Sequence, residues 1–534
     1  MKLNFLFFLL FTVGFKCTAQ QTEKLTPFIL IVQPIVVQSD EGINPASMAL
    51  PEDLVDLAYS KAKVDFHFLE PIYFNNTKAR DGQINLDSIV KLAKKRNYIK
   101  GQNDIVNMFF VNAVDGKNGP LGRGMMGGNI TFITLGNEIG KKNANMQAFV
   151  IAHEVGHNLS LEHAVNDENV PDNIPNIQGD GDYKDRIDPK QSLNQYQIDI
   201  IHKSPLVNNR IDFLNTDRAS KAILDESYEP YFSQLQIREI EAFTNSKVPT
   251  TNLNKAREYA KEKFASAVTN FSEKEKKCIS FVVDKINTIL LKNDIGLMAY
   301  QPWRFVKIEN WLCGGFAHTR GTYIILSQKH IDHLTKTWND NMTAEEEKTL
   351  LEKLGGLLVH EQMHSLQRTF KSRFKSLYTK HWNFTKAHVL NDAAIKKDQV
   401  SNPDAPIAEW LITNPQDANA FYWVRTLLKE TEGIPVMGKD FTDKVFVVQK
   451  INEKYTTVKS ADSKLAYTNL DGIDFYKNAF PISRGIDHPN EISAYMFSDY
   501  FTSLVSNTKP FKETKEESLK NSDSFIKWIK KEMK

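Results

Sequence analysis

The chain has 534 residues, of which 41% are hydrophobic and 11% aromatic, and this content is enough for more than one apolar core. Its formal net charge of +2 gives no electrostatic reason to expect a nucleic-acid partner. Beyond residue 19 no stretch reaches the roughly 18 consecutive apolar residues of a membrane-spanning helix, so we expect no membrane partner for the rest of the chain.

The N-terminus has the pattern of a secretory signal peptide. Lys2 precedes a mostly apolar run over residues 3–15, and the small residues around Cys17–Ala19 are typical of a cleavage site. A lipoprotein signal is the alternative reading of Cys17, but the two residues before it are not the small ones expected there. We therefore expect residues 1–19 to be removed and the protein to be secreted or periplasmic.

The segment that follows, residues 20–208, has an α/β pattern. Runs of β-branched and alternating residues predict strands, and apolar residues at helical spacing predict helices. The predicted strands are 28–32, 35–37, 64–68, 105–111 and 129–134, a glycine-rich turn covers 122–128, and the predicted helices are 87–96 and 193–202.

A metal-binding motif follows the strand at 129–134. His153, Glu154 and His157 form the pattern HExxH, and His163 comes six residues later. Two His four residues apart project from the same face of a helix, so both can reach one metal ion. An apolar stretch at 148–152 precedes the motif, as expected of a helix that is buried behind a metal. Two surface His on an ordinary helix are the alternative.

With this motif, residues 28–208 resemble the metzincin clan of zinc peptidases. The resemblance implies a mixed twisted sheet with the zinc helix behind it. It implies zinc held by His153, His157 and His163, with Glu154 as the general base. It also implies that the strand at 129–134 forms the edge of the cleft and pairs with an extended peptide.

Two positions depart from the metzincin pattern. Ser160 stands at the bend between the second and third His, where the family has Gly because the backbone there has positive φ. The family also places a Met in a turn below the metal, but this chain has no Met between Met146 and Met298. Ile174 or Ile177 could fill that apolar position.

An acidic loop follows the motif. The carboxylates of Asp180, Asp182 and Asp185 could bind Ca²⁺, although a solvated loop is the more ordinary interpretation.

From residue 209 onward helical patterns dominate. We expect a helical connector and linker over 209–254, with a helix at 231–243, and a mostly helical zincin-like domain over 255–534. Within that domain the predicted helices are 256–271 and 275–291, the predicted strand is 323–326, and an amphipathic stretch covers 343–358.

That amphipathic stretch leads directly into a second HExxH, formed by His360, Glu361 and His364. This half resembles the gluzincins, in which a Glu on a later helix completes the zinc site. Glu491 follows Pro and Asn, which are helix-start signals, and small residues beside it would allow a close helix approach. Glu409 is the alternative third ligand. The resemblance assigns Glu361 as the general base.

The stretch 311–320 could line the cleft of this second site. By analogy with the gluzincins, His318 and Arg320 would contact the substrate, whereas Trp311 and Phe316 would serve packing. Tyr495 or His488 could stabilise an oxyanion, and the spacing selects neither.

Three cysteines occur in the chain, and Cys17 would leave with the signal peptide. Cys278 and Cys313 could pair in an oxidising compartment or remain buried thiols. Neither has the spacing of a metal-binding knuckle.

Together these motifs predict a secreted zinc endopeptidase with two tandem sites that acts on proteins or peptides. One alternative is an exported binding or scaffold protein in which one or both zinc domains are inactive. Another is that one domain is catalytic while the other holds structural zinc or positions substrate. The presence of Glu154 and Glu361 favours catalysis, since an inactive copy has no chemical need for the base.

Overall fold

The computed structural model describes residues 25–116, 119–134, 144–170, 176–179, 192–336, 338–390, 393–460, 464–511 and 516–534. The predicted signal peptide, the acidic loop at 180–185 and Ile174 lie outside these residues. Within the described ranges no helix is long and apolar enough to cross a membrane.

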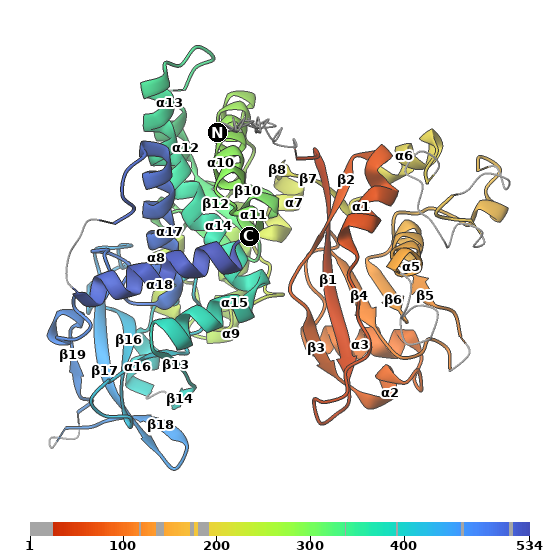
Figure 1. The fold of residues 1–534 in the computed structure, drawn as a ribbon. Coiled ribbons are helices and arrows are strands. Elements are labelled where there is room, and N and C mark those ends of the chain that lie inside the picture. The colour runs from red at the N-terminus through yellow and green to blue at the C-terminus, as the bar shows by residue number, and fades with distance from the viewer. Residues whose placement is uncertain are drawn as a thin grey trace, which may run out of the picture.

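The first half contains a mixed sheet in the order β2-β1-β4-β6-β5, with β3 and β7 also paired to β1 (Figure 1). The strands β1, β2, β3, β4 and β6 run parallel, while β5 and β7 are antiparallel to their neighbours. The strands are β1 Phe28–Gln38, β2 Val64–Phe68, β3 Ile72–Asn75, β4 Val106–Phe110, β5 Gly122–Gly124, β6 Ile130–Ile133 and β7 Val207–Asn209.

Strand β1 joins two runs that were predicted as separate strands. It pairs with β2 over residues 28–32 and with β3 over residues 35–38. Pro34 falls between these two pairings, where a residue without a backbone N–H fits. The proline therefore marks a change of partner and not the end of a strand.

Helices cover both faces of this sheet because successive side chains of a strand point to opposite sides. Leu30, Val32 and Val36 share a core with α1 (Glu52–Tyr59), α5 (Ala144–Asn158) and α6 (Gln195–Ile201). Ile35 and Val37 face the other core, which contains residues of α2 (Thr77–Arg80) and α3 (Leu86–Lys95).

A second sheet has the order β11-β12-β10-β8, with β9 paired to β10. Its strands are β8 Ile211–Phe213, β9 Val268–Thr269, β10 Trp303–Ile308, β11 His318–Arg320 and β12 Tyr323–Ser327. Side chains of β10 and β12 alternate between two apolar cores, so this sheet too is buried on both faces.

The segment 209–254, expected as a connector, packs as part of this second half. It supplies β8, α7 (Thr216–Ala222) and α8 (Ile237–Thr244), and its apolar residues share a core with Val306 and Ile325. The helix predicted over 231–243 begins only at Ile237. The division of the chain into independent domains stays a prediction.

The remaining helices surround this sheet. The amphipathic stretch 343–358 forms α13, a π-helical segment at Leu351–Gly355 and the start of α14 without interruption. The helices are α9 Leu253–Ser266, α10 Glu273–Lys292, α11 Gly296–Tyr300, α12 Gln328–Thr335, α13 Ala344–Leu350, α14 Gly356–Thr369, α15 Lys371–Ser376, α16 Ala393–Asp398, α17 Pro489–Ser506 and α18 Glu516–Glu532.

A third sheet was not predicted, so the expectation of a mostly helical second half is wrong. The sheet is largely antiparallel, in the order β13-β15-β16-β17-β18-β14 with β19 on β17. Its strands are β13 Phe384–Lys386, β14 Val389–Leu390, β15 Trp410–Thr413, β16 Ala420–Leu428, β17 Phe441–Ile451, β18 Lys454–Thr457 and β19 Tyr467–Thr468. Burial alternates along β16, but Tyr422 and Val424 occupy its less buried positions, so the sequence shows no polar alternation.

The two halves lie side by side in Figure 1 and share buried polar contacts. Arg304 of β10 donates to the carboxylate of Asp104, and the Tyr323 hydroxyl donates to the same carboxylate over 2.5 Å. His67 of β2 bonds Gln301 over 2.8 Å, and Gln301 donates to Ser365 of α14 over 2.8 Å. Because these buried polar groups are paired across the contact, they fix how the two halves sit against each other.

Candidate metal centres

Helix α5 carries the first motif on the face that turns away from the sheet core. The Tyr59 hydroxyl of α1 donates to the carbonyl of Ala152 over 2.8 Å, which holds α5 against α1. Residues 148–152 of α5 are buried, in agreement with the apolar run before the motif. The helix is therefore fixed from behind while its motif side chains face the following loop.

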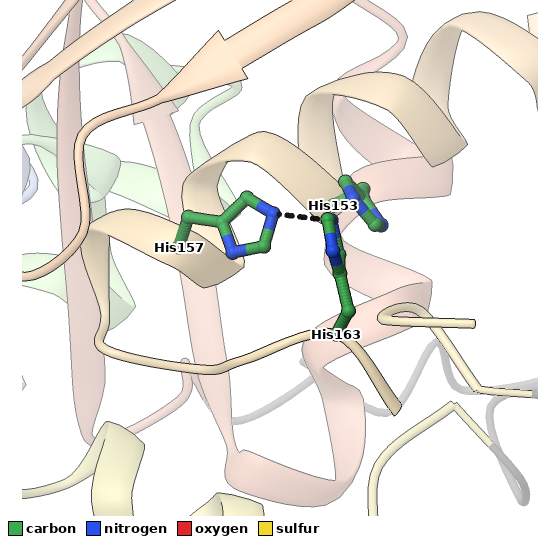
Figure 2. Close-up of side chains that lie close together, drawn as sticks. All are labelled: His153, His157 and His163. Carbon is green, nitrogen blue, oxygen red and sulfur yellow. Dashed lines mark hydrogen bonds between the residues drawn. The ribbon is translucent and has the colours of Figure 1, made fainter. Parts of the chain in front are cut away.

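Three imidazoles converge at this position (Figure 2). His153 and His157 come from α5, and His163 comes from the chain just after it. The Nε2 atoms of His157 and His163 lie 3.0 Å apart, and the ring centroids of His153 and His163 lie 5.1 Å apart. One ligand atom from each ring falls within 4.8 Å of the others, which is close enough to hold one metal ion.

Backbone carbonyls fix the orientation of two of these rings. Nδ1 of His153 lies 2.7 Å from the carbonyl of Ile177, and Nδ1 of His157 lies 2.8 Å from that of Leu161. A carbonyl only accepts, so each Nδ1 carries the hydrogen and each neutral ring keeps a lone pair on Nε2. This is the tautomer that a metal requires, and the donor set of three imidazoles fits zinc.

Glu154 is held beside these rings by strand β5. The backbone N–H of Gly124 donates to Glu154 Oε2 over 2.6 Å, and burial raises the pKa of this carboxyl to about 7. The expected cleft edge at 129–134 is wrong, because β6 is paired on both sides, to β4 and to β5. The antiparallel β5 forms the edge instead, since the glycine-rich turn is long enough to add a strand.

The bend after α5 has the backbone conformation expected from the sequence. Ser160 has φ of +69°, so the positive-φ prediction is confirmed. Ile177, one of the two residues suggested for the place of the missing Met, is fully buried and shares a core with apolar residues of the motif helix. Gly156 allows this approach, because a Cβ there would lie 1.9 Å from Nε2 of Gln178.

A second cluster forms between α14 and α17. Nε2 of His360 and Nε2 of His364 lie 3.2 Å apart, and Oε2 of Glu491 lies 3.6 Å from the first and 3.8 Å from the second. Small residues allow the two helices to meet here, since the Ser498 hydroxyl donates to the carbonyl of Gly356 over 2.8 Å. Two imidazoles and one carboxylate leave room for a further ligand on a metal ion.

The ring orientation of His364 is also fixed. Gln367 donates through Nε2 to the carbonyl of Asn490 and to the Ser493 hydroxyl, both over 2.9 Å. Its Oε1 therefore faces Nδ1 of His364 over 2.9 Å, which places the hydrogen on Nδ1 and the lone pair on Nε2. Nδ1 of His360 is buried and has no partner among the described residues.

The alternative ligand Glu409 is not part of this cluster. Its carboxylate pairs with Lys386 over 2.7 Å. Glu491 is buried, and burial alone would raise its pKa. The adjacent His364 and His360 outweigh burial and hold that pKa well below its usual range, so the group is a carboxylate.

Glu361 stands beside a carboxylate that sequence analysis did not identify. Oε2 of Glu361 lies 3.0 Å from the Thr319 hydroxyl, and the backbone N–H of Thr319 donates to Asp404 over 2.7 Å. Burial, and then the charge of Asp404, raise the pKa of Glu361 to about 8. Asp404, Glu361 and His364 form a further group whose ligand atoms lie within 4.8 Å.

The second cluster opens into a cavity of about 1170 Å³. Phe316 lines it and is 53% exposed, so the expectation that this residue serves packing is wrong. Tyr495 also lines it, with its ring centroid 4.3 Å from that of His360. Of the two candidate oxyanion donors, Tyr495 reaches the cavity, whereas His488 accepts from Asn490 at the start of α17.

The strand β11 before the motif is buried rather than open to the cavity. Arg320 is 1% exposed, donates to the carbonyl of Asp225 and stacks on Tyr231, so its expected substrate contact is wrong. His318 is also buried, and burial lowers its pKa, which leaves the ring neutral at pH 7. Both side chains are buried because β11 lies at a contact between a helix and its sheet, where backbone carbonyls and apolar side chains surround them.

Cys278 and Cys313 are unpaired and buried, which agrees with the interpretation as buried thiols. Burial raises the pKa of both thiols, that of Cys278 to about 12. They are therefore thiols rather than thiolates at neutral pH.

Comparison with known proteins adds little to this geometry. No family model and no curated protein sequence matches the chain. One solved structure that the chain resembles is the crystal structure of metalloproteinase-II from Bacteroides fragilis, at 15% identity and a TM-score of 0.23. The match covers 35% of this chain and 55% of that chain, so the chain spans about half the length of that protein. A TM-score this low establishes neither a shared fold nor a shared activity.

Proposed function

We propose that this protein is an exported zinc endopeptidase with two catalytic centres, at His153, His157 and His163 and at His360, His364 and Glu491. The convergence of three imidazoles next to a glutamate at the first centre is the observation that carries the proposal. Zinc, when bound, would lower the pKa of a water and polarise a peptide carbonyl.

The chain's own residues supply the proton transfer. Glu154 would take a proton from the attacking water and deliver it to the leaving amine. Glu361 would act in the same way at the second centre. The cavity of about 1170 Å³ at that centre has room for an extended peptide, which supports an endopeptidase.

The test uses the full chain loaded with zinc and a denatured protein as substrate. Glu154→Gln and Glu361→Gln keep the shape of each side chain but remove the base. We expect each to keep its zinc and to reduce hydrolysis at its own centre by about 10²–10⁴-fold. Glu409→Gln, which changes a Glu outside both clusters, is the matched control.

The double variant Glu154→Gln with Glu361→Gln separates the alternatives. Loss of hydrolysis in the double variant supports the proposal, and full hydrolysis excludes both centres. A wild-type protein that binds zinc but hydrolyses no peptide would instead be the exported binding protein.

A further inference from the structure

A loop without any motif of its own reaches the second centre from the side. Residues 402–404 follow α16 in the chain, and Asn402 and Asp404 both line the cavity at this centre. Asn402 donates through Nδ2 to Oε1 of Glu491 over 2.7 Å. Asn402 is therefore a direct hydrogen-bond partner of a proposed metal ligand.

This loop is also held by elements other than α17. The backbone N–H of Thr319 in β11 donates to the carboxylate of Asp404 over 2.7 Å. Arg368 of α14 donates to the carbonyl of Pro403 over 2.9 Å. Thr319, Arg368 and Asp404 are all buried. The loop is thus anchored on both sides of Pro403 by contacts that do not involve Glu491.

The orientation of the Asn402 amide follows from its two partners. The backbone N–H of Asp404 donates to Oδ1 of Asn402 over 2.9 Å, a turn contact that asparagine commonly makes. A backbone N–H can only donate and a carboxylate can only accept. The amide oxygen therefore faces Asp404, and the amide nitrogen faces Glu491.

The bond to Asn402 gives the two oxygens of Glu491 different surroundings. Oε1 accepts from Asn402. Oε2 lies 3.6 Å from Nε2 of His360 and 3.8 Å from Nε2 of His364, and these two nitrogens lie 3.2 Å apart. The carboxylate cannot rotate away from this arrangement without losing its bond to the anchored loop.

We propose that Asn402 is a positioning residue for the second metal centre: its amide holds Glu491 so that Oε2 faces the two imidazoles. Hydrogen-bond partners of metal ligands orient those ligands, and removing such a partner typically costs about 10–100-fold in metal affinity. The inference deepens the proposed function and rests on it for the presence of zinc at this centre. The competing role is substrate binding, because Asn402 also lines the cavity.

Zinc affinity is the first readout, because it does not depend on hydrolysis. The full chain with His153→Ala, which removes a ligand of the first centre, is stripped of metal and titrated with zinc against a chromophoric chelator. Asn402→Ala and Asn402→Ser are each added to this parent. A serine hydroxyl can still accept from the backbone N–H of Asp404, but it is uncharged and too short to reach Glu491. We expect each variant to bind zinc about 10–100-fold more weakly than the parent.

Asn414→Ser is the matched control. The Asn414 side chain accepts from the backbone N–H of Gln416 over 3.0 Å, which is the same turn contact, and Asn414 belongs to neither metal cluster. We expect this variant to keep the zinc affinity of the parent. A loss as large as that of Asn402→Ser would overturn the positioning role.

A double-variant cycle tests whether Asn402 acts through Glu491. Without the carboxylate there is nothing for the amide to hold, so adding Asn402→Ser to Glu491→Ala should not weaken zinc binding further. An equal loss with and without Glu491 would mean that the substitution disturbs the histidines, and it would overturn the proposal.

Hydrolysis by the zinc-loaded chain separates the competing role. A raised KM in Asn402→Ser with unchanged zinc affinity would assign Asn402 to substrate binding and overturn the proposal. If the parent binds zinc and Asn402→Ser binds it equally well, the inference fails and the proposed function stands. If the parent binds no zinc, the second centre of the proposed function fails, and the inference fails with it.

Discussion

The two glutamates that follow the first His of each motif are held by different groups. Glu154 accepts from the backbone N–H of Gly124, whereas Glu361 lies beside the Thr319 hydroxyl and next to Asp404. Burial raises the pKa of both carboxyls, that of Glu154 to about 7. At Glu361 the charge of Asp404 adds to the effect of burial, and the pKa rises to about 8.

This difference predicts a pH-dependent effect of Glu361→Gln on stability. Below about pH 4.5 Glu361 is protonated in the folded and unfolded chain alike. As the pH rises toward 8 the unfolded chain releases this proton more readily than the folded chain, so the raised pKa lowers the stability of the metal-free protein. The Glu361→Gln variant has no carboxyl to ionise at this position, so it does not lose this stability as the pH rises. We expect the melting temperature of the variant, relative to wild type, to increase between pH 5 and pH 8.

The measurement is thermal unfolding of chelator-treated protein at several pH values. Glu345→Gln, at an exposed position of α13, should show a constant difference from wild type. If the melting temperature of Glu361→Gln differs from that of wild type by the same amount at pH 5 and at pH 8, the raised pKa of Glu361 is contradicted.

Ser160 gives a second prediction at the residue scale. A non-Gly residue with φ of +69° carries a conformational cost of roughly 1–2 kcal/mol, while Gly adds entropy to the unfolded chain. These effects are of similar size, so Ser160→Gly should be neutral or slightly stabilising in denaturant unfolding. A loss of more than about 1 kcal/mol would show that the serine side chain contributes to the bend.

At the scale of elements, the contact between β5 and α5 defines the first centre. A Cβ at Gly122 would lie 2.5 Å from Cγ of Glu154, and one at Gly124 would lie 1.9 Å from the Glu154 carbonyl. The edge strand therefore touches the motif helix because both positions lack a side chain. This contact brings the Gly124 N–H to the carboxylate.

Gly124→Ala should break this contact. The methyl group would force β5 away from α5, so we expect a destabilisation of more than about 2 kcal/mol and a lower rate of hydrolysis at the first centre. Gly128→Ala, whose Cβ would meet only the side chain of Met125 at 3.2 Å and its carbonyl at 3.5 Å, is the control with the smaller expected loss. Denaturant unfolding measures the first effect and hydrolysis in the Glu361→Gln background measures the second.

Local patterns predicted elements well where one period dominated. The helices α3, α6 and α10 begin and end within two residues of their predicted bounds. Strand β16 was missed because Tyr422 and Val424 pack partly against the large core, so the strand is apolar on both sides. Along β16 more buried and less buried side chains alternate, but polar and apolar residues do not.

At the scale of the whole molecule, the two clusters use separate sets of ligands. The first lies on α5 and the loop after it, and the second lies between α14 and α17. The halves meet at Asp104 and Arg304, and His67 reaches Ser365 of α14, next to the ligand His364, through Gln301. No ligand residue is shared, so each centre should bind and release its metal ion independently of the other.

Elemental analysis of the purified full chain should therefore find two zinc ions per molecule. His153→Ala and Glu491→Ala should each remove one ion, and the double variant should remove both, because deleting one of three protein ligands weakens a zinc site strongly. Glu409→Ala should keep both ions, since that carboxylate pairs with Lys386. Loss of an ion in Glu409→Ala, with none lost in Glu491→Ala, would reassign the third ligand.

The local geometry of both motifs could be predicted from the sequence. Two His four apart must share a helix face, because this depends only on helix periodicity. The positive φ of Ser160 was implied by the resemblance to the metzincins, which have Gly at this bend. Glu491 could be named in advance because a helix-start signal and small neighbours surround it.

The distant groups that meet these motifs are set by the packing of the folded chain and could not be predicted. Asp404, Asn402 and Thr319 reach the second cluster from segments with no motif of their own, and β5 replaces β6 as the sheet edge. Such contacts depend on how sheets and helices pack over long separations, and no periodicity in a single segment encodes them.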